Sequence, residues 1–278
     1  MSSTSSIGSR NRLQCAVLLA SLLAGVSGLA QQLSPQEIIQ RSAEANRRDW
    51  DQAPAYDYFQ RERDGQQTKT SEVIMLAGSR YDRLTAVDDK PLSPEDEARE
   101  QQRWETAVAQ RQHESASERE HRLGQYQKDF DRDHAMVGEL VKALDFTLLG
   151  KQMLGSREVY VLQGTPRAGY RPPNVYAKAL TGMQGKLWID TASFHWVKAE
   201  AEVVRPVWIE GFVARIEPGT HFELEQAPIE DGLWMPSHFS MDAEAKVFLL
   251  FTKYERDDLT YFNYHKPGTG SADTNGVK

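Results

Sequence analysis

The chain has 278 residues, a net charge of −7, 26% charged and 40% hydrophobic side chains, and one cysteine. This is the composition of a globular protein with one large domain or two small ones. The acidic balance argues against a nucleic-acid-binding protein, because such proteins need a basic surface that releases the counterions of phosphate.

The first thirty residues have the pattern of a secretory signal peptide. Arg10 and Arg12 precede an apolar stretch that ends at Ala30, with Gly28 and Ala30 at the positions that signal peptidase reads. We expect cleavage after Ala30 and a periplasmic or otherwise exported protein. Loss of the two arginines would change the net charge from −7 to −9. The alternative is an uncleaved membrane anchor, but Gln14 and several small residues interrupt the apolar stretch. No transmembrane span is expected after cleavage.

One helix and three strands are predicted next. Ser34-Pro-Gln-Glu37 is a capping box with proline at the first helical position, so a helix should run from about residue 34 to 50. Strands are expected at 56–63, 70–77 and 81–87, with the first turn at Asp64-Gly65.

Residues 93–143 read as a helical hairpin inserted into a β chain. Its first arm opens at Ser93-Pro-Glu-Asp96 and is polar nearly all round, as in a solvent-bridging helix, with Trp104 and Val108 as its large apolar residues. A second capping box is expected at Ser117-Glu-Arg-Glu120, before a helix with one apolar face. The segment holds twelve acids and eight bases. Its acidity makes it a candidate dock for an envelope protein, and disorder is the alternative reading.

From residue 145 onward the pattern is that of β-structure. Residues 197–203 alternate strictly between apolar and charged side chains, so one side of that strand should face water. The other strands expected are 146–154, 159–164, 186–190, 207–217, 220–226, 235–242, 246–254 and 259–264. Short connections predict an antiparallel sheet. Residues 267–278 lack apolar anchors apart from Val277 and should form a flexible tail.

Motifs for catalysis and metal binding are absent from the sequence. The histidines of the mature chain show no ligand spacing, and we interpret them as surface or edge-strand residues: His113, His121, His134, His195, His221, His238 and His265. Nucleotide loops and a nucleophile elbow are also missing. Cys15 lies in the leader, so the mature chain offers no thiol. We therefore expect no enzyme, no cofactor and no metal.

A basic loop stands out from the acidic background. Residues 159–189 contain four bases and no acid, including the stiff stretch Thr165-Pro-Arg-Ala-Gly-Tyr-Arg-Pro-Pro-Asn174. Arg167 and Arg171 flank Tyr170, and arginine forks suit phosphate or carboxylate. The expectation is that this loop holds an anionic head group at a cavity mouth. A plain surface loop is the alternative.

Aromatic residues gather on the carboxy-terminal strands. The stretch around Trp208 and Phe212 is apolar on both faces and needs cover on both sides. A curved sheet wrapped around helices would supply that cover, and an unfilled part of it would be an apolar ligand cavity lined by Trp208 and Phe212. Ordinary core packing is the alternative.

Two segments resemble a known superfamily. Gly185-Lys-Leu-Trp-Ile-Asp190 and Val197-Lys-Ala-Glu200 resemble a strand pair of the outer-membrane lipoprotein-sorting, or periplasmic lipoprotein-carrier, superfamily. The chain is also similar to a branch of exported bacterial proteins through Arg80-Tyr-Asp-Arg-Leu84, Asp89-Lys-Pro-Leu-Ser93 and the basic loop. The resemblance implies an incomplete antiparallel barrel, helices on its concave side, and a cavity for acyl chains. The charged hairpin departs from the carriers, whose plugs are short and apolar.

The expected fold class is α+β, with a curved antiparallel sheet, helices on its concave side, and one carrier-like domain over residues 31–266. The function expected is non-enzymatic binding of a lipid or lipid-modified polypeptide. The alternative is an envelope protein-interaction or sensor module whose half-barrel is filled by its own helices. A cavity on the order of several hundred Å³ would favour ligand binding, and native packing throughout would favour the alternative.

Overall fold

The computed structural model describes residues 33–209, 214–247 and 251–267. The expected signal peptide, the end of the expected tail, and Phe212 lie outside these ranges. All the described helices and strands belong to one unit, Pro35–Lys278. Within the described ranges, no helix combines the length and the apolar character that a membrane span requires.

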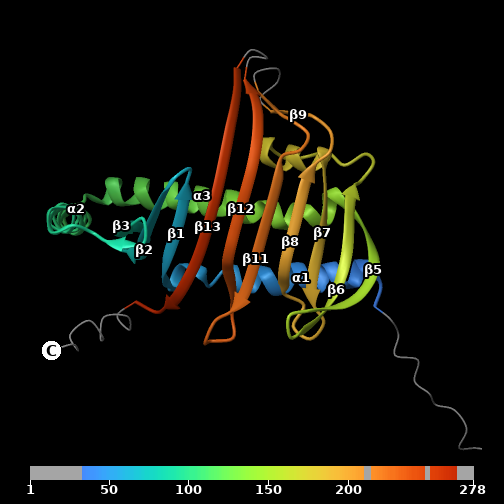
Figure 1. Cartoon of the computed structure of the whole chain (residues 1–278), viewed down its shortest axis with the longest axis horizontal. Coiled ribbons are helices and arrows are strands. Elements are labelled where there is room, and N and C mark those ends of the chain that lie inside the picture. Colours follow the sequence, from blue (N-terminus) through green and yellow to red (C-terminus); the bar gives the residue numbers. More distant parts are fainter. Residues whose placement is uncertain (1–32, 210–213, 248–250, 268–278) are drawn as a thin grey trace, which may run out of the picture. The chain divides into compact units, whose positions relative to one another are not determined.

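An open antiparallel sheet is the main element, and the expected α+β class is confirmed. Eleven strands follow the order β4-β3-β2-β1-β13-β12-β11-β8-β7-β6-β5, with β10 paired to β12 and β9 paired to β10 (Figure 1). The strands are β1 Asp57–Asp64, β2 Gln67–Leu76, β3 Ser79–Val87, β4 Lys90–Pro91, β5 Leu144–Leu154, β6 Arg157–Pro166, β7 Met183–Asp190, β8 Trp196–Val203, β9 Val207–Ile209, β10 Ala214–Ile216, β11 His221–Pro228, β12 Trp234–Val247 and β13 Phe251–His265. Since β4 and β5 form its two edges, the sheet does not close into a barrel.

The first and last strands meet inside the sheet. β1 pairs with β13, with Phe59 opposite Phe262 and their rings stacked at 5.6 Å. Strands from the two ends of the sequence are thus neighbours, and this pairing joins β1–β4 to the rest of the sheet.

Helices α1 Pro35–Trp50 and α3 Ala116–Ala143 run across one face of the sheet, and α2 Pro94–His113 lies beside β3 near the sheet edge (Figure 1). The remaining helical elements are the short α4 Val175–Lys178 and 3-10 turns at Ala53–Ala55 and Ala179–Gly182. α3 contacts α1 and reaches both β3 and β5, near opposite edges of the sheet. Its 28 residues correspond to roughly 42 Å of helix, which is long enough for this crossing.

The two consecutive helices differ in how they pack. α2 buries only Glu100 among its residues, and it meets β3 through Trp104, whose ring lies 5.3 Å from that of Tyr81. α3 begins with a capping box formed by Ser115 and Glu118, two residues earlier than the pair predicted at Ser117 and Glu120. That prediction was wrong because both serines satisfy the same spacing rule, and only Glu114 and Ser115 separate the two helices.

Two predicted strands are interrupted by chain reversals. The strand predicted at 207–217 is the antiparallel pair β9 and β10. The strand predicted at 246–254 spans the reversal between β12 and β13, where Val247 pairs with Phe251. The segment 247–251 is a continuous apolar run and contains no periodic signal that marks a reversal. In the first stretch, Glu210 and Gly211 interrupt the apolar residues.

One end of the covered face is filled by core packing. The carboxy-terminal end of α3, the 3-10 turn Ala179–Gly182 and strands β5, β7, β8 and β9 bury a common cluster: Ala143, Leu144, Leu180, Met183, Val203 and Val207. Leu140, Phe146 and Tyr170 pack against this cluster from the side. This part of the half-barrel is therefore occupied by the protein's own side chains.

Candidate functional site

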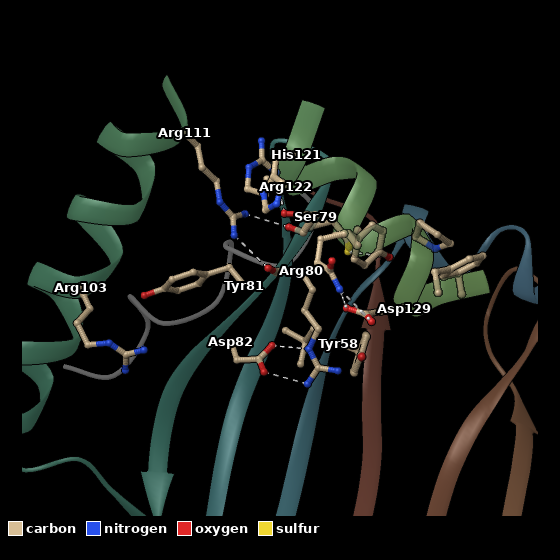
Figure 2. A pocket seen from close by; sticks show the side chains of 17 residues that line it. Tyr58, Ser79, Arg80, Tyr81, Asp82, Arg103, Arg111, His121, Arg122 and Asp129 are labelled. Atoms are coloured by element: carbon tan, nitrogen blue, oxygen red, sulfur yellow. Dashed lines mark hydrogen bonds and ion pairs between the residues drawn. The ribbon is translucent and has the colours of Figure 1, made fainter. Parts of the chain in front are cut away.

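The other end of the covered face contains a large cavity (Figure 2). Its volume is about 860 Å³, and it lies between strands β1–β3 and helices α2 and α3. Ligand sites typically measure about 300–1,000 Å³. The cavity therefore has the size of a binding site for a small molecule or a lipid chain.

The sheet and α3 supply an apolar and aromatic wall. Val73 and Met75 are two residues apart on β2, so they point to the same face. Tyr126 and Phe130 are four residues apart on α3 and also share a face, with ring centroids 6.2 Å apart. The hydroxyl of Tyr126 lies 3.9 Å from the sulfur of Met75. An alkyl chain could lie along this wall and would contact few polar groups.

Tyr58 adds an uncharged polar group to the wall. Its ring stacks on Tyr264 at 5.0 Å and meets Tyr261 edge-on at 6.0 Å. Burial raises the pKa of Tyr58, and burial likewise raises the pKa of Tyr126. Both phenols are therefore neutral at physiological pH.

Four arginines line the cavity, and three of them are paired with carboxylates. The guanidinium of Arg80 donates to Asp82 at 2.5 and 3.0 Å, and Arg103 donates to Glu100 at 2.6 Å. Arg122 donates to Glu114 at 2.5 and 3.0 Å. The first two ion pairs include exposed side chains, so they contribute little to stability.

Arg111 is held differently, by backbone carbonyls alone. It donates to Leu76 and Ser79 through Nη1 at 2.6 and 3.0 Å, and to Arg80 through Nη2 at 3.0 Å. Its guanidinium also lies 5.8 Å from the ring of Tyr81. Burial and the neighbouring charge of Arg122 lower the pKa of Arg111, although an arginine stays protonated throughout the physiological range.

The arginines also attach both helices to the β2–β3 turn. Arg111 of α2 and Arg122 of α3 both bond to Ser79, through its carbonyl at 3.0 Å and its hydroxyl at 2.7 Å respectively. Arg122 further donates to the carbonyl of Ala77 at 3.2 Å. The turn has positive φ angles at Ala77 and Gly78. Figure 2 shows Arg111 and Arg122 beside Ser79, the residue that follows this turn.

The basic loop expected to hold a head group lies at the filled end. Arg167 donates to the carboxylate of Asp145 at 2.7 Å and to the carbonyl of Leu144 at 2.9 Å, which joins the loop to β5. Tyr170 donates its hydroxyl to Glu139 at 2.7 Å, and Arg171 is exposed. None of the three lines the 860 Å³ cavity. Any ligand contact by them stays a prediction.

The two aromatic residues predicted to line a cavity were Trp208 and Phe212. Trp208 lies on β9, with the guanidinium of Arg215 at 5.1 Å from its ring centroid, and it does not line the large cavity. Phe212 is outside the described residues. A crevice beside the filled cluster, bounded by Leu140, Phe146 and Met183, measures about 60 Å³, too little for an acyl chain.

One histidine departs from the surface positions expected. His195 is 7% exposed, and its ring stacks on Trp234 at 5.2 Å. Its Nε2 lies 2.9 Å from a carboxylate oxygen of Asp49, but outside hydrogen-bond geometry. Burial lowers the pKa of His195, which favours the neutral form of its ring in the folded protein. Among the described residues, no cluster of three or more histidine, cysteine, aspartate or glutamate side chains is arranged to hold a metal ion.

The sequence patterns did not predict this cavity. Three of its four arginines come from residues 93–143, whose summed charge is acidic, and its aromatic wall comes from the amino-terminal strands and α3, not from the aromatic-rich carboxy-terminal strands. The apolar helical face that includes Tyr126 and Phe130 was a usable signal for one wall.

Comparisons with known proteins give remote structural matches. No family model and no curated protein matches the chain. A crystal structure of a LolA superfamily protein from Nitrosomonas europaea is similar, with 13% identity, 84% of this chain and 93% of that chain covered, and a TM-score of 0.32. A putative outer membrane lipoprotein-sorting protein domain from Vibrio parahaemolyticus shows 10% identity, coverage of 84% and 95%, and a TM-score of 0.31. A DUF1329 family protein from Desulfovibrio piger shows 11% identity, coverage of 87% and 96%, and a TM-score of 0.30. At these identities and TM-scores the matches transfer no ligand, partner or residue role to this chain.

Proposed function

We propose that this protein is a non-enzymatic carrier-like binding protein for a lipid or lipid-modified polypeptide. The observation that carries the proposal is the cavity of about 860 Å³ between β1–β3 and the helices α2 and α3. Export through a leader cleaved after Ala30 is part of the proposal, because an extracytoplasmic carrier must first cross the inner membrane.

The lining of the cavity matches an amphiphilic ligand. Val73, Met75, Tyr126 and Phe130 form a continuous apolar strip on opposing elements, and burying apolar surface is worth about 25 cal/mol per Å². The same cavity is lined by arginines from three elements: Arg80 of β3, Arg103 and Arg111 of α2, and Arg122 of α3 (Figure 2). An acyl chain along the strip would leave its polar end among these cationic groups.

A cavity-filling substitution tests the proposal. In Met75→Trp the larger side chain would occupy the space between β2 and Tyr126, so we expect the purified variant to lose most of the lipid that the wild-type protein retains from cells. Mass spectrometry of organic extracts from both proteins measures the difference.

Met153→Trp is the matched control. Met153 is 62% exposed on β5, the edge strand far from the cavity in the strand order, and the same substitution there should leave the retained lipid unchanged. Absence of lipid from the wild-type protein, together with no binding of added lipid, would contradict the proposal.

A protein-interaction module is the second candidate. It is favoured by the filled end of the half-barrel and by α2, which presents nearly all of its length to solvent. In that case an envelope protein would dock on the acidic helices and the cavity would remain without lipid. The lipid analysis above separates the two candidates, since only the carrier proposal requires a bound amphiphile.

A further inference from the structure

Three of the four arginines that line the cavity are paired with a carboxylate. Arg80 donates to Asp82, Arg103 to Glu100, and Arg122 to Glu114. Arg111 is the lining arginine whose guanidinium donates to no carboxylate among the described residues.

The donor capacity of Arg111 is incompletely used. A guanidinium has five N–H donors, and the three hydrogen bonds of Arg111 all go to backbone carbonyls. No carboxylate among the described residues accepts a hydrogen bond from it. By contrast, Arg122 makes five hydrogen bonds, two of them to Glu114.

The position of Arg111 is set before any ligand binds. Its bonds to Leu76, Ser79 and Arg80 fix the guanidinium against the β2–β3 turn, and Tyr81 supports it from the side (Figure 2). A fixed cation loses little conformational freedom when it binds an anion. Arg122 bonds to the same residue, Ser79, while its own charge is paired with Glu114.

We propose that the ligand of this cavity carries an anionic head group, a phosphate or a carboxylate, that is bound by Arg111. This inference rests on the proposed function and specifies its ligand class. The acyl chain lies along Met75, Tyr126 and Phe130, and the head group meets the unused donors of Arg111. Charge-assisted bonds from a guanidinium to such oxygens are among the stronger hydrogen bonds in proteins.

A series of probes with one alkyl chain and different head groups tests the inference on the unmodified protein. Decyl phosphate, decanoate, decanol and decyltrimethylammonium are titrated calorimetrically into the lipid-stripped mature protein, below their micellar concentrations. We expect at least one anionic probe to bind about tenfold more tightly than decanol, and the cationic probe to bind more weakly still. The ratio between decyl phosphate and decanoate distinguishes phosphate from carboxylate head groups.

Two arginine variants locate the effect. Arg111→Gln should abolish the anionic preference while decanol binding persists. Arg99→Gln is the matched control, since Arg99 lies on the same helix, pairs with Glu95 and Asp96, and is not part of the lining. Circular dichroism melting verifies that each variant is folded.

The outcomes separate this inference from the proposed function. Equal binding of all four probes would overturn the anionic head group and leave lipid binding intact. An anionic preference that survives in folded Arg111→Gln would overturn the role of Arg111. If Arg111→Gln does not fold, the probe series on the wild-type protein still decides the head-group class. Failure of every probe to bind would contradict the proposed function as well.

Discussion

Gly185 is the first residue of the motif Gly185-Lys-Leu-Trp-Ile-Asp190, and the neighbouring strands explain why a glycine is needed there. It lies on β7 opposite Ala201 of β8 and Gly164 of β6. A Cβ atom at Gly185 would come within 2.2 Å of the carbonyl oxygen of Glu200, a distance that no side chain tolerates. The glycine is therefore required by the close approach of two backbones.

Substitution of this glycine should destabilise the fold. Gly185→Ala places a methyl group against backbone that cannot move freely, and we expect the free energy of unfolding to fall by about 1–3 kcal/mol. The control is Gly124→Ala in the middle of α3, where no atom lies within 4 Å of the added Cβ and alanine should stabilise the helix by about 0.5–1 kcal/mol. Urea unfolding of both variants measures the two effects. A Gly185→Ala variant as stable as the wild type would contradict the steric account.

Among the helices and strands, the start of α3 shows most clearly how residues close in sequence fix the end of an element. The hydroxyl of Ser115 accepts from the backbone N–H of Glu118 at 3.3 Å, and the carboxylate of Glu118 accepts from the N–H of Ser115 at 2.8 Å. Two otherwise unpaired donors are satisfied by this exchange. Ser117, two residues later, lies inside the helix.

The two serines should therefore respond differently to substitution by alanine. Ser115→Ala removes the cap and should lower the free energy of unfolding by about 1 kcal/mol. Ser117→Ala puts a good helix former in the first turn and should be neutral or slightly stabilising. Urea unfolding of both variants distinguishes them, and a larger loss in Ser117→Ala would point to the cap predicted from the sequence.

For the whole molecule, the pairing of β1 with β13 is the critical long-range contact. β13 pairs with β1 on one side and with β12 on the other, so Thr260 is opposite both Arg61 and His238. Without β13, strands β1–β4 would lose their connection to the rest of the sheet, and one wall of the cavity would lose its support.

Truncation tests this dependence. Deletion of residues 251–278 removes β13. We expect the product to lack a cooperative unfolding transition, because the edges of β1 and β12 that pair with β13 would lose their hydrogen-bond partners. Deletion of residues 268–278 removes most of the segment predicted to be a flexible tail and should leave the transition unchanged, because that segment has no apolar anchor apart from Val277. Differential scanning calorimetry compares the two. A cooperative transition in the shorter product would mean that β1–β4 fold independently of β13.

Local patterns in the sequence determined the class and most elements of this protein. The capping residues of α1, the alternation along β8 and the apolar face of α3 each depend on neighbours within a few residues, and the structure contains all three elements. The order of strands and helices with short connections was enough to predict an antiparallel α+β sheet. The reversal within the apolar run 247–251 was not predictable, since hydrophobicity there does not alternate.

Only the tertiary structure decided which end of the covered sheet face is packed with side chains and which end contains the cavity. The summed charge of residues 93–143 is acidic, yet packing turns Arg103, Arg111 and Arg122 toward the cavity. The acid-free loop at Arg167 was the more conspicuous signal, and it lies at the filled end, where Asp145 pairs with that arginine. Counting charges along a segment averages over all its faces, whereas a binding site depends on the one face that meets other elements. Which face that is follows from contacts between residues far apart in the sequence.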